Sequence, residues 1–289
     1  MFNQKLTQAV EDFSSLVFPL SEKELELEWK WKDHDKEGIR FAFFVTLQEL
    51  RQLAVTLSTP SSSLRAAPTP AQHILSQYHA AYMDLQAALL GVSDAEAEQI
   101  PAEGEWQARK VYAHVLGAEF GFTAAIRYAL ELHRAGKWTI DPIPESEYPR
   151  LYAISDEEYG ELMEGPLSGM LAHHRNFHEQ ILEEFSSIQA HELDLPSTFW
   201  EETRFPIRHR LHRYEAHFAQ HTVQIDKTLA AIGQGPNESK RLLRKIHAAL
   251  AETEGVLIGA EKTDEAAILE TASSIAERTK EIESILFGS

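Results

Sequence analysis

Apolar residues recur along much of the chain at the spacing of helix faces. Two stripes lie in the first 57 residues, and each predicts an amphipathic helix. Between them, apolar residues at 25, 27, 29 and 31 alternate with charged ones, which is typical of a short extended segment. The first stripe contains Phe2, Leu6, Val10, Phe13 and Val17, and the second contains Phe43, Leu47, Leu50, Ala54 and Leu57.

Two breaks divide the chain into a middle block and two flanks. Residues 58–70 (STPSSSLRAAPTP) are too rich in proline and serine for a helix to continue, and residues 233–238 (GQGPNE) carry helix-ending Gly and Pro. The middle block, 71–232, predicts four long helices separated by proline-containing loops. These helices are expected at about 71–91, 106–134, 156–188 and 206–232.

The two flanks each predict a pair of amphipathic helices. Neither pair can bury both of its apolar faces alone, so residues 1–57 and 239–289 are expected to pack together as a second helical bundle. The alternative is that each hairpin lies separately on the middle bundle. The predicted fold class is therefore all-α, with an up-down four-helix bundle at 71–232 and a second bundle built from the two ends.

Composition excludes several classes of function. The sequence contains no cysteine, so it has no disulfide, no thiolate ligand and no cysteine nucleophile. A net charge of −18 without a local basic cluster argues against nucleic-acid binding. No apolar run is long enough to span a membrane, and the N-terminal segment lacks the apolar core of a signal peptide, so we expect a cytoplasmic protein. A homodimer is left open.

Histidine is the residue type that points to chemistry. Two pairs, His174 with His178 and His217 with His221, have the i,i+4 spacing that places two side chains on one helix face. Apolar residues surround His217 and His221, and a histidine that interrupts an apolar stripe must be hydrogen-bonded or ligated. The neighbours of His174 and His178 are polar and predict a more solvated face. His114, with apolar neighbours on an earlier helix, is available as a third ligand.

Other catalytic patterns are absent from the sequence. It has no H-E-x-x-H, no Glu-x-x-His, no nucleophile elbow and no P-loop. Glu119 and Glu215 are the nearest acid–base candidates, but both are expected to face away from the histidines, so catalytic and substrate-binding residues stay unassigned. Gln224 is placed to contact the site from one turn beyond His221, and a core hydrogen bond is its alternative role. His209 and His212 are expected at the surface.

Two segments resemble the DinB-like superfamily of bacterial four-helix bundles. Residues 103–119 (EGEWQARKVYAHVLGAE) look like that family's Trp-containing entry to its second helix, and residues 212–225 (HRYEAHFAQHTVQI) look like its H-x-x-x-H helix. The resemblance covers about 71–232 and implies that His114, His217 and His221 are a metal triad. The flanks fall outside it, and a second bundle that is a divergent copy would be metal-free.

The resemblance also implies a range of functions. Three imidazoles leave at least one coordination position of a divalent ion open, and Zn²⁺ suits them best, with Ni²⁺, Fe²⁺ and Mn²⁺ as alternatives. Characterised relatives include transferases and isomerases that use low-molecular-weight thiols such as bacillithiol or mycothiol. A thiol transferase is favoured over a hydrolase; a non-catalytic metal-containing binding or stress-response module, and a structural relic, are the other hypotheses. An anionic thiol would need basic residues at the pocket mouth, and the alternative, favoured for most of the candidates, is that they form a solvated basic rim near two helix starts. The candidates are Arg109, Lys110, Arg208, Arg210 and Arg213.

Overall fold

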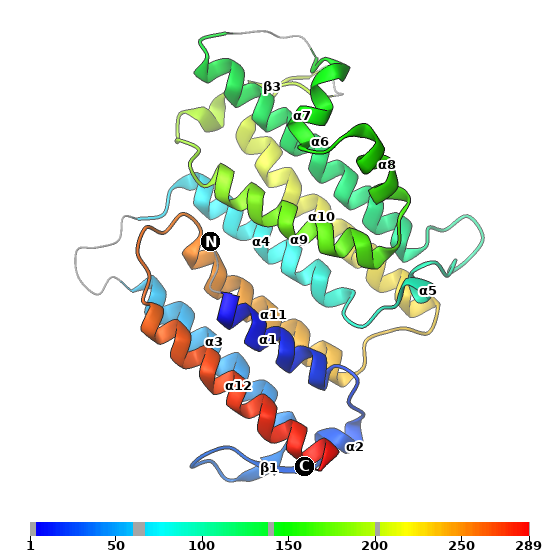
Figure 1. Cartoon of the computed structure of the whole chain (residues 1–289), viewed down its shortest axis with the longest axis vertical. Helices are drawn as coiled ribbons and strands as arrows, with labels where there is room; N and C mark the ends of the chain where they lie inside the picture. The colour runs from blue at the N-terminus through cyan, green and yellow to red at the C-terminus, as the bar shows by residue number, and fades with distance from the viewer. Residues whose placement is uncertain (1–3, 60–66, 138–141, 200–202, 289) are drawn as a thin grey trace. The chain divides into compact units, whose positions relative to one another are not determined.

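The computed structural model describes residues 4–59, 67–137, 142–199 and 203–288, and the predicted all-α class is confirmed (Figure 1). Phe2 and parts of three predicted loops, at 60–66, 138–141 and 200–202, lie outside the described residues. The chain divides into two compact units. One comprises Met1–Ala67, Met83–Gly91 and Gly235–Ser289, and the other comprises Pro68–Tyr82 and Val92–Gln234. None of the described helices has the length and apolar character needed to cross a membrane.

The first unit brings the two ends of the chain together in four helices. Helices α1 and α3 each pack against both α11 and α12 (Figure 1). The apolar stripes face inward: Phe13 and Phe43 are buried, and their rings meet edge to face at 5.5 Å. The four helices are α1 (Gln4–Val17), α3 (Arg40–Ser58), α11 (Glu238–Leu257) and α12 (Glu265–Phe287).

A short helix and a two-stranded hairpin connect α1 to α3. Helix α2 (Glu22–Leu25) is followed by β1 (Glu28–Lys30) and β2 (Lys36–Gly38), which pair antiparallel in the region where alternation predicted an extended segment. The indoles of Trp29 and Trp31 are buried and stacked, with ring centroids 5.6 Å apart. The guanidinium of Arg278, fully buried, lies over the Trp31 ring at 4.6 Å.

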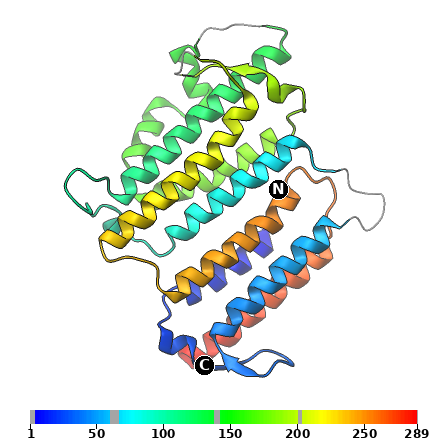
Figure 2. The ribbon, with the colours of Figure 1, turned by 180° about the vertical axis from the view of Figure 1, so that it is seen from behind.

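The second unit is built around four long helices, of which α4, α6 and α10 lie side by side in the view from behind (Figure 2). They are α4 (Pro70–Ala88), α6 (Ala108–Arg134), α9 (Leu167–Phe185) and α10 (Ile207–Ala231). The last turns of α4, from Met83, belong to the first unit. Helix α10 ends as the sequence predicts, because Gly233 adopts a left-handed conformation with φ of 80°.

The single helix predicted at 156–188 is wrong, because the chain forms two helices there. Helix α8 (Asp156–Glu164) starts at a capping box made by Ser155 and Glu158 and ends before α9 begins at Leu167. Pro166 excludes the helical conformation for the preceding residue, and Gly165 is indeed extended, with ψ of 177°. The prediction followed the apolar spacing across this proline.

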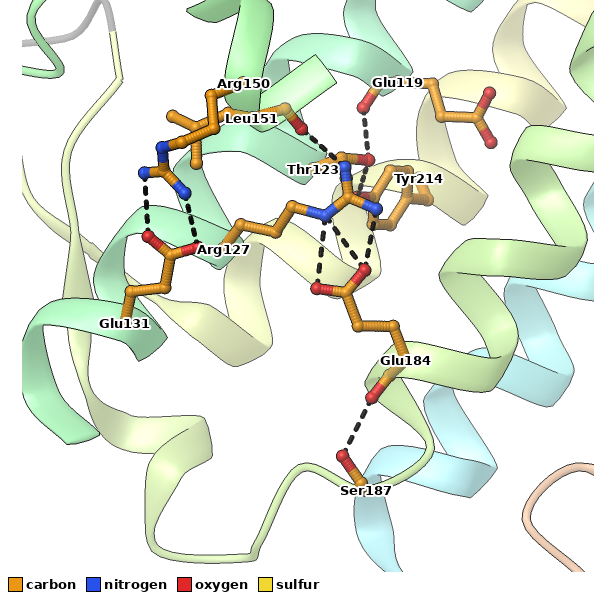
Figure 3. A network of polar contacts seen from close by, with 9 residues as sticks. All are labelled: Glu119, Thr123, Arg127, Glu131, Arg150, Leu151, Glu184, Ser187 and Tyr214. Carbon is orange, nitrogen blue, oxygen red and sulfur yellow. Dashed lines mark hydrogen bonds and ion pairs between the residues drawn. The ribbon is translucent and has the colours of Figure 1, made fainter. Parts of the chain in front are cut away.

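Short elements complete the second unit. They are α5 (Asp94–Ala97), η1 (Glu145–Glu147), α7 (Tyr148–Tyr152), η2 (Glu192–Asp194), β3 (Pro196–Ser197) and β4 (Phe205–Pro206). Ion pairs join two of them, α7 and η2, to the long helices of the unit. Figure 3 shows how α7 is attached: Arg127 on α6 donates to both carboxylate oxygens of Glu184 on α9 and to the carbonyl of Leu151. Arg150 on α7 also pairs with Glu131 on α6.

Candidate metal centre

Three histidines from two helices meet in the second unit. His114 lies on α6, and His217 and His221 lie one turn apart on α10. Each offers one ring nitrogen, and these three atoms all lie within 4.8 Å of one another. The three histidines singled out in the sequence are therefore brought together. In the part of the chain that the structure describes, no other set of three His, Asp or Glu side chains is grouped this tightly.

The helical repeat of α10 places two of the three histidines on its buried face. Helix α10 buries Tyr214, Phe218 and Ile225 along one stripe, and His217 and His221 interrupt that stripe. Both histidines are buried, whereas His114 is exposed. The cluster is therefore closed on the side of α10 and accessible on the side of His114.

Burial and mutual repulsion keep the imidazoles of His114 and His217 neutral. Burial lowers the pKa of His217 to about 3, with further lowering by His221, His114 and Arg213. Burial also lowers the pKa of His114, and His221 adds to the effect. A neutral imidazole is the form that ligates a metal.

The geometry of the cluster fits a divalent ion. His114 Nε2 lies 3.2 Å from His217 Nε2. Two nitrogens at tetrahedral positions around Zn²⁺, each at ~2.05 Å, are separated by about 3.3 Å. His221 Nδ1 lies 2.8 Å from Gln224 Oε1, a contact in which Nδ1–H donates and Nε2 is left as the free nitrogen. Gln224 therefore makes the contact that its spacing suggested.

Two of the five basic candidates lie close to the triad. Lys110 Nζ is 4.9 Å from the centre of the Trp106 ring, and that ring meets His114 edge to face at 5.6 Å. Arg213 lies over Phe122, whose ring is 6.0 Å from His217. These two side chains place positive charge near the cluster.

The other three basic candidates have different roles. Arg109 pairs with Glu98 and donates to the carbonyl of Met163, and Arg208 pairs with Asp194. Arg210 is fully buried, so its expected place at a solvated rim is wrong. It donates to Ser197 and lies over the Phe205 ring. His209 stacks on the same ring, and His212 is exposed as expected.

A second polar cluster lies elsewhere in the same unit, and the sequence reasoning missed it. Glu119, His174 and His178 are at most 1% exposed. His174 Nε2 lies 2.5 Å from Glu119 Oε2, and His178 Nδ1 lies 3.9 Å from Glu119 Oε1. The expected solvated face for His174 and His178 is wrong: they continue the buried stripe of Met170, Phe177 and Ile181, and the polar residues between them point outward. That stripe was the signal that could have found them.

Burial and the closeness of the three groups set the electrostatics of this second cluster. Burial raises the pKa of Glu119, but the adjacent imidazoles of His174 and His178 outweigh it and hold the pKa at about 2. Burial lowers the pKa of His178 to about 3. Glu119 is thus an ionised carboxylate in the core. It faces away from the triad, as expected, because its carboxylate contacts His174 in this second cluster.

The fold and the site together define a class: an all-α bundle protein with a candidate metal centre made of three histidines at an accessible point. A sequence profile of the DinB superfamily matches residues 77–225, more than half of the chain and all of the triad. The chain belongs to the DinB superfamily, whose members are typically metal-binding. Comparison with curated proteins and with solved structures gives no match.

Proposed function

We propose that His114, His217 and His221 bind one divalent metal ion, with Zn²⁺ preferred over Ni²⁺, Fe²⁺ and Mn²⁺. The observation that carries this proposal is the grouping of three ring nitrogens within 4.8 Å, two buried and one on the accessible side. Three protein ligands and an open position are typical of catalytic rather than structural zinc sites. When bound, such an ion lowers the pKa of a ligand thiol or water and supplies a nucleophile at neutral pH.

The neighbours of the triad favour a thiol cosubstrate over direct hydrolysis. Metal-dependent hydrolases commonly pair the ion with a carboxylate general base. The groups that act on His114 and His217 are the other histidines and Arg213, and Glu119 is held in the second cluster. A thiol bound to the ion would lose its proton at neutral pH, and the resulting thiolate attacks without a separate general base. The chain has no cysteine, so the thiol must come from a small molecule.

The protein's own residues would then bind and orient that thiol. Lys110 and Arg213 lie near the cluster, where their charge favours an anionic cosubstrate. Trp106 offers an apolar surface beside His114. Gln224 holds the ring of His221 in place. The proposed activity is a metal-dependent thiol S-transferase, and the alternative is a metal-containing binding module without turnover.

The first experiment tests the metal. Full-length protein purified without a His-tag is analysed for metal, together with His217→Ala and, as a matched control, His212→Ala, which removes an exposed histidine from the same helix. His217→Ala should lose the triad ion, and His212→Ala should keep it. Equal metal contents in the two variants would contradict the proposal.

The second experiment separates a transferase from a binding module. Co²⁺-loaded protein is mixed with cysteine, glutathione or bacillithiol, and a sulfur-to-cobalt charge-transfer band reports thiolate ligation. Turnover is then measured with 1-chloro-2,4-dinitrobenzene as the electrophile. Thiol ligation with turnover supports the transferase; ligation without turnover favours the binding module; and an unchanged cobalt spectrum contradicts a thiol cosubstrate.

A further inference from the structure

The second polar cluster contains three buried polar atoms that make no hydrogen bond. Glu119 comes from α6, and His174 and His178 come from adjacent turns of α9. Each residue has one buried polar atom without a hydrogen-bond partner: Glu119 Oε2, His174 Nε2 and His178 Nδ1. Glu119 Oε2 and His174 Nε2 lie 2.5 Å apart but are not aligned for a hydrogen bond.

The other polar atom of each residue is held by a partner. The Tyr112 hydroxyl lies 2.6 Å from His174 Nδ1, and His79 Nδ1 lies 2.9 Å from His178 Nε2. The Tyr78 hydroxyl donates to Glu119 Oε1. Metal-ligating histidines are held in this way, with one nitrogen fixed by a neighbouring group and the other turned to the ion. All three of these partners are themselves buried.

Arg127, the basic residue of α6 in the neighbouring ion-pair network, does not pair with the cluster. Figure 3 shows the Glu119 carboxylate pointing away from Arg127, which is committed to Glu184. Buried polar atoms without partners are rare in folded proteins, and an unseen ion or water is a common explanation for them. A cation among the three atoms would satisfy them together.

We propose that Glu119, His174 and His178 form a second divalent-metal site, distinct from the triad. Two imidazoles and one carboxylate suit Fe²⁺, Mn²⁺, Co²⁺ and Zn²⁺. The three ligand atoms are less evenly grouped than those of the triad. Binding of an ion would therefore move Glu119 Oε2 and His174 Nε2 apart and draw His178 Nδ1 towards them. The ion crosslinks α6 to α9 in the core, and its complete burial assigns it a structural role.

The test is the number of ions per chain, measured by Co²⁺ titration and elemental analysis of the full-length, untagged protein. The wild type should bind two ions. The double variant His217→Ala/His221→Ala should bind one, and Glu119→Gln should also bind one, at the triad. The control His173→Gln, which changes the neighbouring histidine on α9, should bind two. His79→Gln should weaken the second site several-fold and leave the triad unchanged.

The wild type and the triad variant decide the matter without any change to the second cluster. One ion in the wild type and none in the triad variant would overturn the proposal and leave Glu119 and His174 as a buried ion pair. Two ions in a folded Glu119→Gln protein, checked by far-ultraviolet circular dichroism, would overturn it as well. One ion in the wild type and one in the triad variant would support the second site and contradict metal binding by the triad.

Discussion

Gln224 Oε1 lies 2.8 Å from His221 Nδ1, one helical turn further along α10. This contact fixes the orientation of a proposed metal ligand through a residue that touches no metal itself. Both residues lie on the same helix, so their relationship depends only on local geometry.

Replacing Gln224 with Leu should weaken metal binding at the triad. The substitution removes the acceptor for His221 Nδ1–H, and such partners are typically worth about 10–100-fold in metal affinity. The control is Gln220→Leu, an exposed position on the same helix. Competition with a chelator measures both affinities, and equal values for the two variants would show that Gln224 does not support the ligand.

The pairing of His217 with His221 could be predicted from sequence because its signal is local: the two are four residues apart on a helix with a clear apolar stripe. His114 lies 103 positions before His217; its apolar neighbours made it available as a third ligand, and the resemblance of 103–119 grouped it with the pair. The second cluster depends on contacts between residues more than 50 positions apart. The polar neighbours of His174 predicted an exposed side chain. The helical spacing of His174 and His178 with Met170, Phe177 and Ile181 would have predicted a buried one.

The apolar stripes of the flanks predicted helices but not their supporting polar contacts. Arg278 lies three residues after Ile275 and four before Ile282, so its spacing is that of the buried stripe of α12, whereas its charge is typical of an exposed side chain. Its position depends on Thr46, Glu49 and Trp31 from the other end of the chain. Such long-range pairs have no periodic signature.

Removing Glu49 should destabilise the first unit. Arg278 Nη2 donates to Glu49 at 2.7 Å, so Glu49→Ala leaves a buried guanidinium without its counter-ion. We expect a loss of about 2–4 kcal/mol in the free energy of unfolding. The double variant Glu49→Ala/Arg278→Met should recover part of this loss, and strictly additive effects in urea unfolding would contradict the coupling.

His247 should make the first unit sensitive to mild acid. Burial lowers its pKa to about 4, and its Nε2 lies 3.2 Å from the Ser14 hydroxyl. The unfolded chain takes up this proton near pH 6.5, so stability is lost as pH falls from there towards 4. By pH 5 the loss is about 2 kcal/mol. Urea unfolding at pH 7 and pH 5 should show this loss in the wild type and in the exposed-site control His212→Gln, but a smaller one in His247→Leu. Equal losses in all three proteins would exclude His247 as the source.

Deleting residues 239–289 should make the protein aggregate. The deletion removes α12 and nearly all of α11, and these are the two helices against which both α1 and α3 pack. The buried faces that carry Phe13 and Phe43 would then be exposed to water, at a cost of about 25 cal/mol per Å² of apolar surface. Light scattering and binding of a hydrophobic dye measure the outcome, with a deletion of residues 288–289 as the control. A monomeric truncation that keeps α1 and α3 protected from hydrogen exchange would show that the N-terminal hairpin is stable without its C-terminal partners.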